Sequence, residues 1–302
     1  MGKEVEIQRG LVLSEQQELL LDLHAVGNIL NIVGLRIGEI ATLVGADDEA
    51  DRMGELVSEW YERLQRRTET VAQLGRVAEM RTRVLGAAIA LQPRVPAPQR
   101  QLFDEHLENL ESIFNVLAMR ATELIERADG WNHWSTVSLE HLQATLRANF
   151  EAIEKNSMRR YHIAFAPEQR APGDYLMEFH FRSRDGRSIR MPVVLTDVVR
   201  DLACNARKYT DPGGWIRVTL VEEDNGLLLQ VEDNGRGIPE DEIAGVVEFG
   251  QRASNVGNRV QTGGGFGMTR AYAVVKTFGG RMWIRSGNGE GTRVTIRIPT
   301  VR

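Results

Sequence analysis

The sequence has few of the residues that crosslink a chain or carry it through a membrane. Cys204 is its single cysteine among 302 residues, which excludes an internal disulfide and a multi-cysteine metal site. The longest apolar stretch that we find, residues 85–91, is far shorter than the roughly 20 residues of a transmembrane helix. The first ten residues hold no apolar signal core. We therefore expect no membrane span and a reducing, cytoplasmic compartment.

Neither sign of charge dominates the composition. Lys and Arg number 37 against 42 Asp and Glu, a net charge of −5, which gives no field to attract DNA or RNA as a main ligand. The hydrophobic fraction of 42% and the charged fraction of 26% are those of an ordinary soluble globular protein rather than a disordered chain. At about 150 residues per domain, the length predicts two domains.

Proline is absent from residues 14–160 except at positions 93, 96 and 98, and this scarcity favours long helices. In the first helix, apolar residues recur in alternating steps of four and three from Leu19 to Val44. Ser135 or Ser138 is expected to cap the last helix. Long amphipathic helices with short connections predict an antiparallel four-helix bundle within residues 1–160. The predicted helices cover residues 14–44, 51–91, 98–128 and 137–158.

Two segments of this helical region are alike. Residues 31–40 and 115–124 lie 84 positions apart and carry apolar and charged residues at matching positions. The match fits a bundle built from two related helical hairpins. It equally fits chance, because any two amphipathic helices share such a pattern.

Beyond residue 160 the pattern changes to short strands mixed with helices. Hairpin turns are predicted at residues 184–187 and 224–226, and helices at 195–209 and 268–278. This order predicts an α+β sandwich over residues 161–302, with helices on one face of a sheet. The predicted strands are 161–165, 175–181, 187–193, 215–223, 227–233, 281–286 and 292–298.

The helix predicted at 195–209 carries a polar face. Asp201, Asn205 and Lys208 follow at i, i+4 and i+7, and Tyr209 lies beside them. Carboxylate and amide oxygens hold Mg²⁺, and a lysine meets phosphate as a point charge. Alone, this stripe also fits a solvated surface helix.

Three glycine-rich segments follow. Asp233 ends a strand just before Gly235 and Gly237, where a buried carboxylate would accept a hydrogen bond from an exocyclic amine such as that of adenine. The segment TGGGFGM (262–268) opens a helix whose backbone N–H groups can bind an anion. Gly291 and Thr292 lie at the start of the last predicted strand. Each segment by itself also fits an ordinary turn.

As a set, these segments resemble the Bergerat-type (GHKL) ATP-binding domain shared by sensor histidine kinases, Hsp90 chaperones, DNA gyrase B and MutL. DLACNARKYT resembles the N box of that family and VEDNGRGIP its first glycine box. EFGQRAS resembles the phenylalanine box, TGGGFGM the second glycine box and GEGT the last box. Within it, the segment NARKYT is similar to the N-box sequence of histidine kinases in particular. The family's N box usually begins with Glu, where this sequence has Asp201.

The resemblance implies an ATP–Mg²⁺ site. Asn205 and Asp201 would bind Mg²⁺, and Lys208 would contact the phosphates. Tyr209 would pack on the nucleotide, and Asp233 would recognise adenine. A mobile lid is expected over residues 250–266. The other residues expected to shape the pocket are Gly235, Gly237, Gly263, Gly265, Gly267 and Thr292.

The first helix resembles the dimerisation and phosphotransfer helix of histidine kinases. His24 follows seam residue Leu23, and Asn28 lies four positions on along the same face. A neutral imidazole is a good nucleophile near pH 7. In the family an acidic residue usually follows the histidine; Ala25 stands there instead. Alternatively, His24 is an ordinary surface histidine. His106 is a second candidate for the residue that accepts phosphate.

The resulting expectation is a soluble histidine kinase that phosphorylates His24 and passes the phosphoryl group to an aspartate in the receiver domain of a response regulator. An upstream sensor protein or the bundle itself would supply the input. Two alternatives stay open. One is a protein serine kinase resembling the branched-chain and pyruvate dehydrogenase kinases, and the other is a nucleotide-regulated docking or phosphotransfer module. Because one chain supplies four helices, we expect a monomer, or a homodimer formed through another surface.

Overall fold

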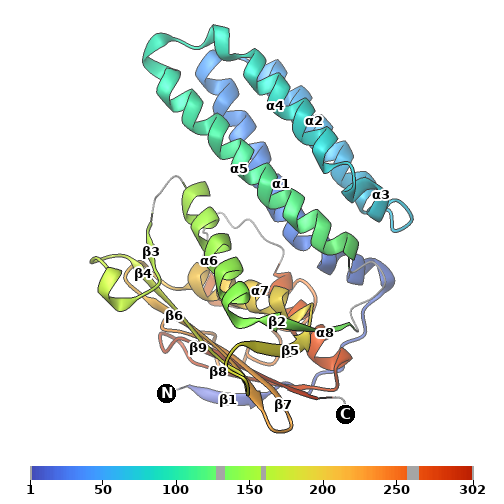
Figure 1. The fold of residues 1–302 in the computed structure, drawn as a ribbon, viewed down its shortest axis with the longest axis vertical. Coiled ribbons are helices and arrows are strands. Elements are labelled where there is room, and N and C mark those ends of the chain that lie inside the picture. Colours follow the sequence, from blue (N-terminus) through green and yellow to red (C-terminus); the bar gives the residue numbers. More distant parts are fainter. Residues whose placement is uncertain (1, 127–132, 158–160, 257–264, 301–302) are drawn as a thin grey trace. The chain divides into compact units, whose positions relative to one another are not determined.

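A computed structural model describes residues 2–126, 133–157, 161–256 and 265–300. The chain forms two compact units: a helical unit, Leu13–Asp129, and a sheet unit made of Met1–Val12 and Gly130–Arg302 (Figure 1). This division differs from the boundary expected at residue 160. Strand β1 (Lys3–Glu6) pairs with the sheet, and helix α6 (Leu139–Asn156) packs against strands of the sheet unit.

The helical unit is built from four long helices and one short one. α1 (Glu15–Val44) packs against α2 (Asp47–Leu64) and α5 (Arg100–Glu126), and α4 (Val77–Ala90) also packs against α2 and α5. The short helix α3 (Thr70–Leu74) connects α2 to α4. Pro93 and Pro98 lie in two 3₁₀ turns between α4 and α5, and Pro96 stands just before the second turn. The four long helices therefore surround one shared core.

The apolar seam of α1 forms one wall of this core. Leu23, Val26, Leu30, Val33 and Ile37 are each at most 4% exposed. α1 is also the one described helix that is long and apolar enough to cross a membrane by length and composition. In the structure its seam contacts α2 and α5 instead.

The single helix expected over residues 51–91 is wrong. The chain leaves the helix after Leu64, where Thr70 Oγ1 donates to the Leu64 carbonyl at 2.9 Å, and it returns as α4. An unbroken helix of that length would extend about 60 Å against about 45 Å for α1, so much of its apolar stripe would lack a partner. Doubling back buries Trp60, Leu64 and Met80. The helix expected at 137–158 is therefore not the fourth helix of this unit; it is α6, which begins after its N-cap Ser138.

The sheet unit holds a seven-stranded sheet in the order β1-β8-β9-β7-β6-β4-β3. β3, β4 and β6 run parallel, and the other neighbours are antiparallel. α7 (Leu195–Tyr209) packs on β6 and β7, and α8 (Phe266–Thr277) packs on β8, β9 and α7. Helices layered on a sheet are the architecture that the sequence predicts. The remaining strands are β3 (Ile163–Ala164), β4 (Tyr175–Arg182), β6 (Trp215–Glu223), β7 (Gly226–Asp233), β8 (Arg281–Ser286) and β9 (Thr292–Pro299).

The two expected hairpins have different outcomes. β6 and β7 form an antiparallel pair closed at Glu223 and Gly226, as predicted. The turn at 184–187 exists, since Asp185 Oδ1 accepts from the N–H of Arg187 at 2.8 Å. The strands that this turn joins do not pair, so the predicted hairpin is wrong. β4 lies parallel to β6, while β5 (Ser188–Pro192) pairs with the unforeseen strand β2 (Trp134–Ser138).

Candidate nucleotide-binding site

The polar face of α7 forms one side of the candidate site. Asn205, Lys208 and Tyr209 are half-buried there, while Leu202 and Ala206 on the other face lie in the core. No other group in the described part of the chain bonds the Asn205 amide. A Cβ on Gly267 would lie 2.8 Å from Asn205 Nδ2, so the start of α8 approaches the amide closely only because residue 267 is glycine. The amide oxygen is thus open to a ligand next to a glycine-rich helix start.

Asp233 sits at the end of β7 and is 8% exposed. Its Oδ1 accepts from the N–H of Gly235 at 2.8 Å, and the backbone N–H of Thr292 also donates to it. Burial raises the pKa of this carboxyl to about 7, against the opposing effect of the two N–H donors. A buried carboxyl held by N–H groups rather than by a cation suits a neutral donor such as an exocyclic amine.

Backbone hydrogen bonds bring the predicted boxes together. The N–H of Arg236 donates to the Tyr209 carbonyl at 3.1 Å, and the N–H of Gly291 donates to the Gly235 carbonyl at 3.0 Å. A Cβ on Gly235 would lie 2.4 Å from the Tyr209 carbonyl oxygen. Gly237 has a φ of 71°, and its Cβ would lie 1.8 Å from the Gly287 carbonyl oxygen. Both glycines are therefore sterically required where the boxes meet.

Basic side chains surround Lys208. Burial lowers the pKa of Lys208, and the nearby Arg252 and Arg207 lower it further. Arg252 and Arg236 also lie close enough to Tyr209 to affect its phenol. This concentration of positive charge suits the phosphates of a nucleotide. Sequence reasoning did not single out Arg236 and Arg252, although both stand inside motifs that it identified.

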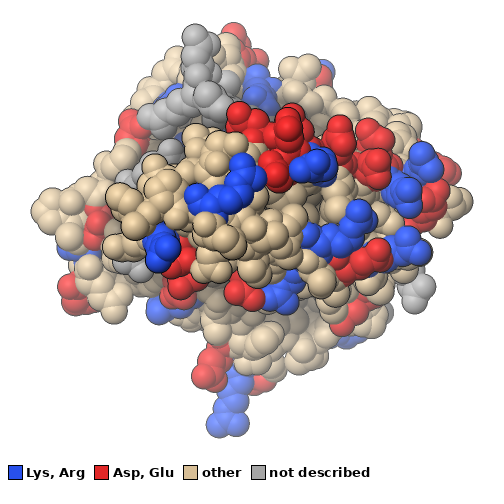
Figure 2. Space-filling view, turned by 90° about the horizontal axis from the view of Figure 1, so that it is seen from above, with Lys and Arg blue, Asp and Glu red and all other residues tan. Residues whose placement is uncertain are grey.

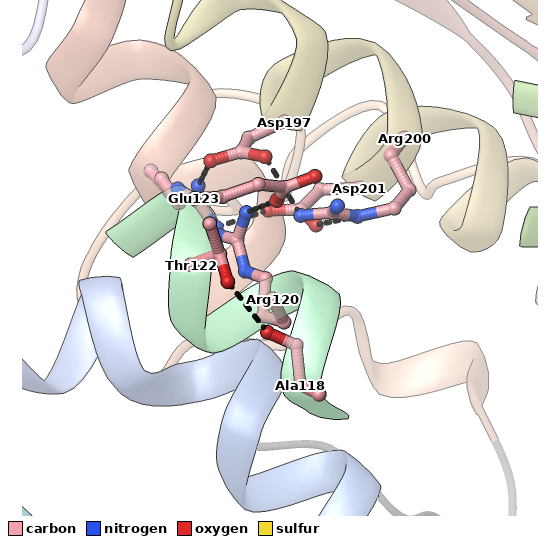
Figure 3. Close-up of polar contacts among 8 residues, drawn as sticks. Ala118, Arg120, Thr122, Glu123, Asp197, Arg200 and Asp201 are labelled. Atoms are coloured by element: carbon pink, nitrogen blue, oxygen red, sulfur yellow. Dashed lines mark hydrogen bonds and ion pairs between the residues drawn. The ribbon is translucent and has the colours of Figure 1, made fainter. Parts of the chain in front are cut away.

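A buried ion-pair network joins α7 to α8, and the sequence analysis did not foresee it. Arg270 of α8 is 1% exposed; its Nη1 donates to Asp201 Oδ2 at 3.1 Å, and its Nη2 donates to Asp197. Arg200 Nη2 donates to Asp197 Oδ1 at 2.8 Å. Figure 3 shows Asp197, Arg200 and Asp201 converging along α7. The Asp201 carboxylate is therefore engaged within the protein, and we interpret it as the partner of Arg270 rather than as a metal ligand.

The described residues contain no group of three or more His, Cys, Asp or Glu side chains placed to hold a metal ion. A Mg²⁺ ion here would thus rely on the Asn205 amide and on the oxygens of the phosphates it accompanies. Of the other expected residues, Thr292 starts β9, and its Oγ1 lies 3.0 Å from Ser286 Oγ. Gly265 precedes α8 with a φ of 76°. Gly263 and residues 257–264 of the expected lid lie outside the described residues.

In the helical unit, the structure brings His24 and Asn28 together. Asn28 Nδ2 lies 3.1 Å from His24 Nε2, and both residues are half-buried on α1. A contact in which the Asn28 amide N–H₂ donates requires the ring tautomer whose lone pair is on Nε2.

His106 is placed differently. It is buried, and its Nδ1 accepts from Arg36 Nη1 at 2.9 Å. Burial and the Arg36 charge together lower its pKa. His106 thus belongs to a buried polar cluster of α1 and α5 and is 6% exposed, whereas His24 is half-buried.

Comparisons with known proteins find matches to the sheet unit and to longer histidine kinases. Residues 191–302 match the family described as histidine kinase-, DNA gyrase B-, and HSP90-like ATPase. The sensor histidine kinase WalK of Bacillus subtilis is 32% identical over 107 residues, which cover 35% of this chain and 18% of WalK. The adaptive-response sensory kinase SasA of Synechococcus elongatus is 30% identical over 212 residues, 67% of this chain and 48% of SasA.

The chain spans less than half the length of these curated relatives. Among solved structures, the catalytic domain of histidine kinase ThkA aligns with a TM-score of 0.39 at 17% identity, over 55% of this chain and 95% of ThkA's. Residues 191–302 are thus similar to the histidine kinase-, DNA gyrase B- and HSP90-like ATPase family, and the curated relatives that the chain resembles are histidine kinases.

Proposed function

We propose that this protein is an ATP-dependent histidine kinase of a two-component system. It binds ATP–Mg²⁺ in the sheet unit, phosphorylates His24 and passes the phosphoryl group to an aspartate of a response-regulator receiver domain. One observation supports the proposal: the polar face of α7, with Asn205 and Lys208, and the end of β7, with Asp233, are joined by close backbone contacts of the glycine-rich segments. Relatives that are sensor histidine kinases support the choice of acceptor.

Each group at this site has a chemical task. The Asp233 carboxylate accepts a hydrogen bond from the exocyclic amine of adenine, while Gly235 and Gly237 keep the backbone close to the base. Lys208 and Arg252 offset the charge of the phosphates. The Asn205 amide oxygen would hold Mg²⁺, which neutralises phosphate charge when it is bound.

In the first transfer, the Nε2 lone pair of His24 attacks the γ-phosphorus of ATP. A nitrogen–phosphorus bond forms, the bond from the γ-phosphorus to the bridging oxygen breaks, and ADP leaves. The proton on Nδ1 is released as the ring becomes phosphorylated. Asn28 holds the ring with its lone pair on Nε2 and gives up this hydrogen bond as the new bond forms. Catalysis rests mainly on positioning, since the neighbouring Ala25 supplies no base.

In the second transfer, the nitrogen–phosphorus bond breaks and a receiver aspartate accepts the phosphoryl group as an acyl phosphate. His24 regains a proton and returns to its resting state. An aspartate oxygen is the attacking atom, so this step requires the partner domain and no second nucleotide.

The proposal is tested by incubation with γ-labelled ATP and Mg²⁺ of the wild type and the variants His24→Gln, His106→Gln and Asn205→Ala. We expect a label that acid removes and alkali does not, lost in His24→Gln and Asn205→Ala but kept in His106→Gln. Unchanged ATP binding by His24→Gln is the control for folding. Acid-stable label that survives His24→Gln would contradict the proposal and indicate a serine kinase. Absence of any label on a wild type that binds ATP would contradict it in favour of a docking module.

A further inference from the structure

One tyrosine of the helical unit lies against the turn of α1 that follows His24. α2 packs along α1, and the Tyr61 side chain of α2 reaches the backbone of α1 at Gly27. A Cβ at position 27 would lie 2.7 Å from the Tyr61 hydroxyl oxygen and 3.1 Å from its Cζ, so any larger residue would push the phenol away. Gly34 and Gly38 of the same helix have no neighbour within 4 Å of such a Cβ among the described residues. Position 27 is thus where a glycine of α1 admits a side chain of α2.

The Tyr61 hydroxyl is a donor without an acceptor in the part of the chain that the structure describes. Tyr61 is half-buried, and its hydroxyl is not among the unpartnered polar atoms that are sealed from solvent. Burial raises the pKa of the phenol, so the group stays protonated at neutral pH. The hydroxyl can therefore donate a hydrogen bond to a group at the surface of α1.

His24 lies next to this hydroxyl along the helix. It precedes Gly27 by three positions, so the Cβ positions of the two residues are about 5–6 Å apart. At 3.6 residues per turn, position 27 lies about 60° to one side of position 24 and position 28 about 40° to the other. Asn28 Nδ2 is 3.1 Å from His24 Nε2, which places Nε2 over the turn that Tyr61 contacts. A phosphoryl group on Nε2 would thus be flanked by Asn28 and by the Tyr61 hydroxyl.

We propose that the Tyr61 hydroxyl donates a hydrogen bond to the phosphoryl group that His24 receives, and is a catalytic residue of that transfer. The inference rests on the proposed function and deepens it. The bond from Nε2 to phosphorus forms and the bond from phosphorus to the leaving group breaks, as in the first transfer above. The phenol keeps its proton throughout. A hydrogen bond to a charged phosphoryl oxygen is among the stronger kinds, and it offsets the contact that Asn28 gives up.

Rates of His24 labelling by ATP–Mg²⁺ in the full chain test this role. Tyr61→Phe keeps the ring and removes the hydroxyl, so we expect a labelling rate constant at least tenfold lower at saturating ATP, with unchanged ATP affinity. Gly27→Ala keeps the phenol but displaces it, and is expected to slow labelling to a similar extent, with no further loss in the double variant. Gly38→Ala makes the same change in open space and should label as the wild type does. Wild-type rates in Tyr61→Phe, or a loss explained by weaker ATP binding, would overturn the proposal.

A second measurement does not depend on kinase activity. Phosphoramidate phosphorylates histidine without a nucleotide, and the ³¹P signal of phosphorylated His24 is identified by its absence in His24→Gln. A donated hydrogen bond favours the more highly charged form of the phosphoryl group, so the titration midpoint of this signal should move to higher pH in Tyr61→Phe and Gly27→Ala but not in Gly38→Ala. Identical midpoints in all variants would overturn the proposal even if ATP labels His24. A midpoint that moves in a protein that ATP does not label would support the Tyr61 contact and contradict the kinase activity instead.

Discussion

Among single residues, Asp233 has the clearest chemical signature. Burial raises the pKa of its carboxyl to about 7, and among the described residues N–H groups, but no cation, contact it. Substitution by asparagine would place an amide N–H₂ against the N–H groups of Gly235 and Thr292, or turn it toward the base. We therefore expect Asp233→Asn to weaken ATP binding about 10- to 100-fold, the effect of about 1–3 kcal/mol for an unmade buried hydrogen bond. Isothermal titration measures it, with Asp224→Asn at the fully exposed hairpin tip as the control. Equal affinities in the two variants would contradict the role of Asp233.

The raised pKa of Asp233 also predicts a pH dependence of stability. The pKa rises from 3.8 to about 7 on folding, so between these pH values the folded protein keeps a proton that the unfolded chain has lost. The stability of the nucleotide-free protein should therefore fall as the pH rises from about 4 to about 7, and change little from this group above that. The melting temperature of the wild type, followed across this range, is expected to fall more steeply than that of Asp233→Asn. Parallel curves would show that Asp233 does not titrate there.

Nucleotide binding should reverse part of this shift. The ionised carboxylate accepts the amine hydrogen bond more strongly than the neutral acid, so bound adenine lowers the pKa of Asp233. ATP affinity should then increase as the pH rises through about 7, with release of a proton on binding. Binding heats measured in buffers of different ionisation enthalpy detect that proton. A wild type whose binding heat is independent of the buffer near pH 7 would contradict this coupling.

Between elements, the Arg270 network sets the contact of α7 with α8. Arg270 holds two carboxylates of α7, and Asn205 and Gly267 face each other where the same two helices approach. Arg270→Met leaves Asp197 buried and without this partner, so we expect a loss of about 3–5 kcal/mol of stability together with weaker ATP binding. Arg184→Met, at an exposed ion pair, should cost about 0–1 kcal/mol. Thermal melts with and without ATP give both quantities. If Arg270→Met were as stable as Arg184→Met, the ion-pair network would not be what holds α7 against α8.

The structure adds to the likeness of residues 31–40 and 115–124. Arg36 of α1 and Arg120 of α5 are 2% and 3% exposed, and each donates to the glutamate three residues on, Glu39 and Glu123. Figure 3 shows the Arg120 to Glu123 pair on α5. The residue before each arginine, Leu35 or Met119, is 55% exposed. Buried arginines are uncommon, so their agreement favours related helices over a chance match of amphipathic patterns.

Local signals in the sequence were enough for α1 of the helical unit and for most elements of the sheet unit. The 4,3 spacing predicts α1, and the helix at 195–209 and the 224–226 hairpin lie where pattern and turn residues place them. The failures involve partners distant in sequence. β5 pairs with β2 rather than β4, and β1 joins β8, because strand pairing depends on which edge is free. The break after Leu64 follows from the length of the core, which no local window of sequence reports.

The candidate site was predictable to a similar extent. The sequence singles out Asn205, Lys208, Asp233 and the glycines because the boxes carry them, and their roles stay predictions. Arg270 was missed because its two carboxylate partners lie on a helix about 70 positions earlier, and an arginine in an amphipathic helix is ordinarily exposed.

At the scale of the whole molecule, one chain supplies all the helices that surround the core of the helical unit. We therefore expect His24 to receive phosphate from its own chain. Co-expression of His24→Gln, which keeps the ATP site, with Asn205→Ala, which keeps the histidine, should then yield no label on either chain. Label on the Asn205→Ala chain would contradict this expectation and indicate transfer between chains of a dimer.

Acidic and basic side chains are interspersed over the face drawn in Figure 2, as the nearly balanced composition leads one to expect.

The measurement that tests the account most directly is identification of the phosphorylated residue. Trypsin cleavage after Arg9 and Arg36 releases a peptide, residues 10–36, whose single histidine is His24, whereas His106 falls in the peptide 101–120. After incubation with ATP–Mg²⁺ and digestion at neutral pH, tandem mass spectrometry is expected to find one phosphoryl group on His24 in peptide 10–36. A phosphoryl group on His106 instead, or on a serine or threonine, would contradict the assignment of His24 as the residue that receives phosphate from ATP.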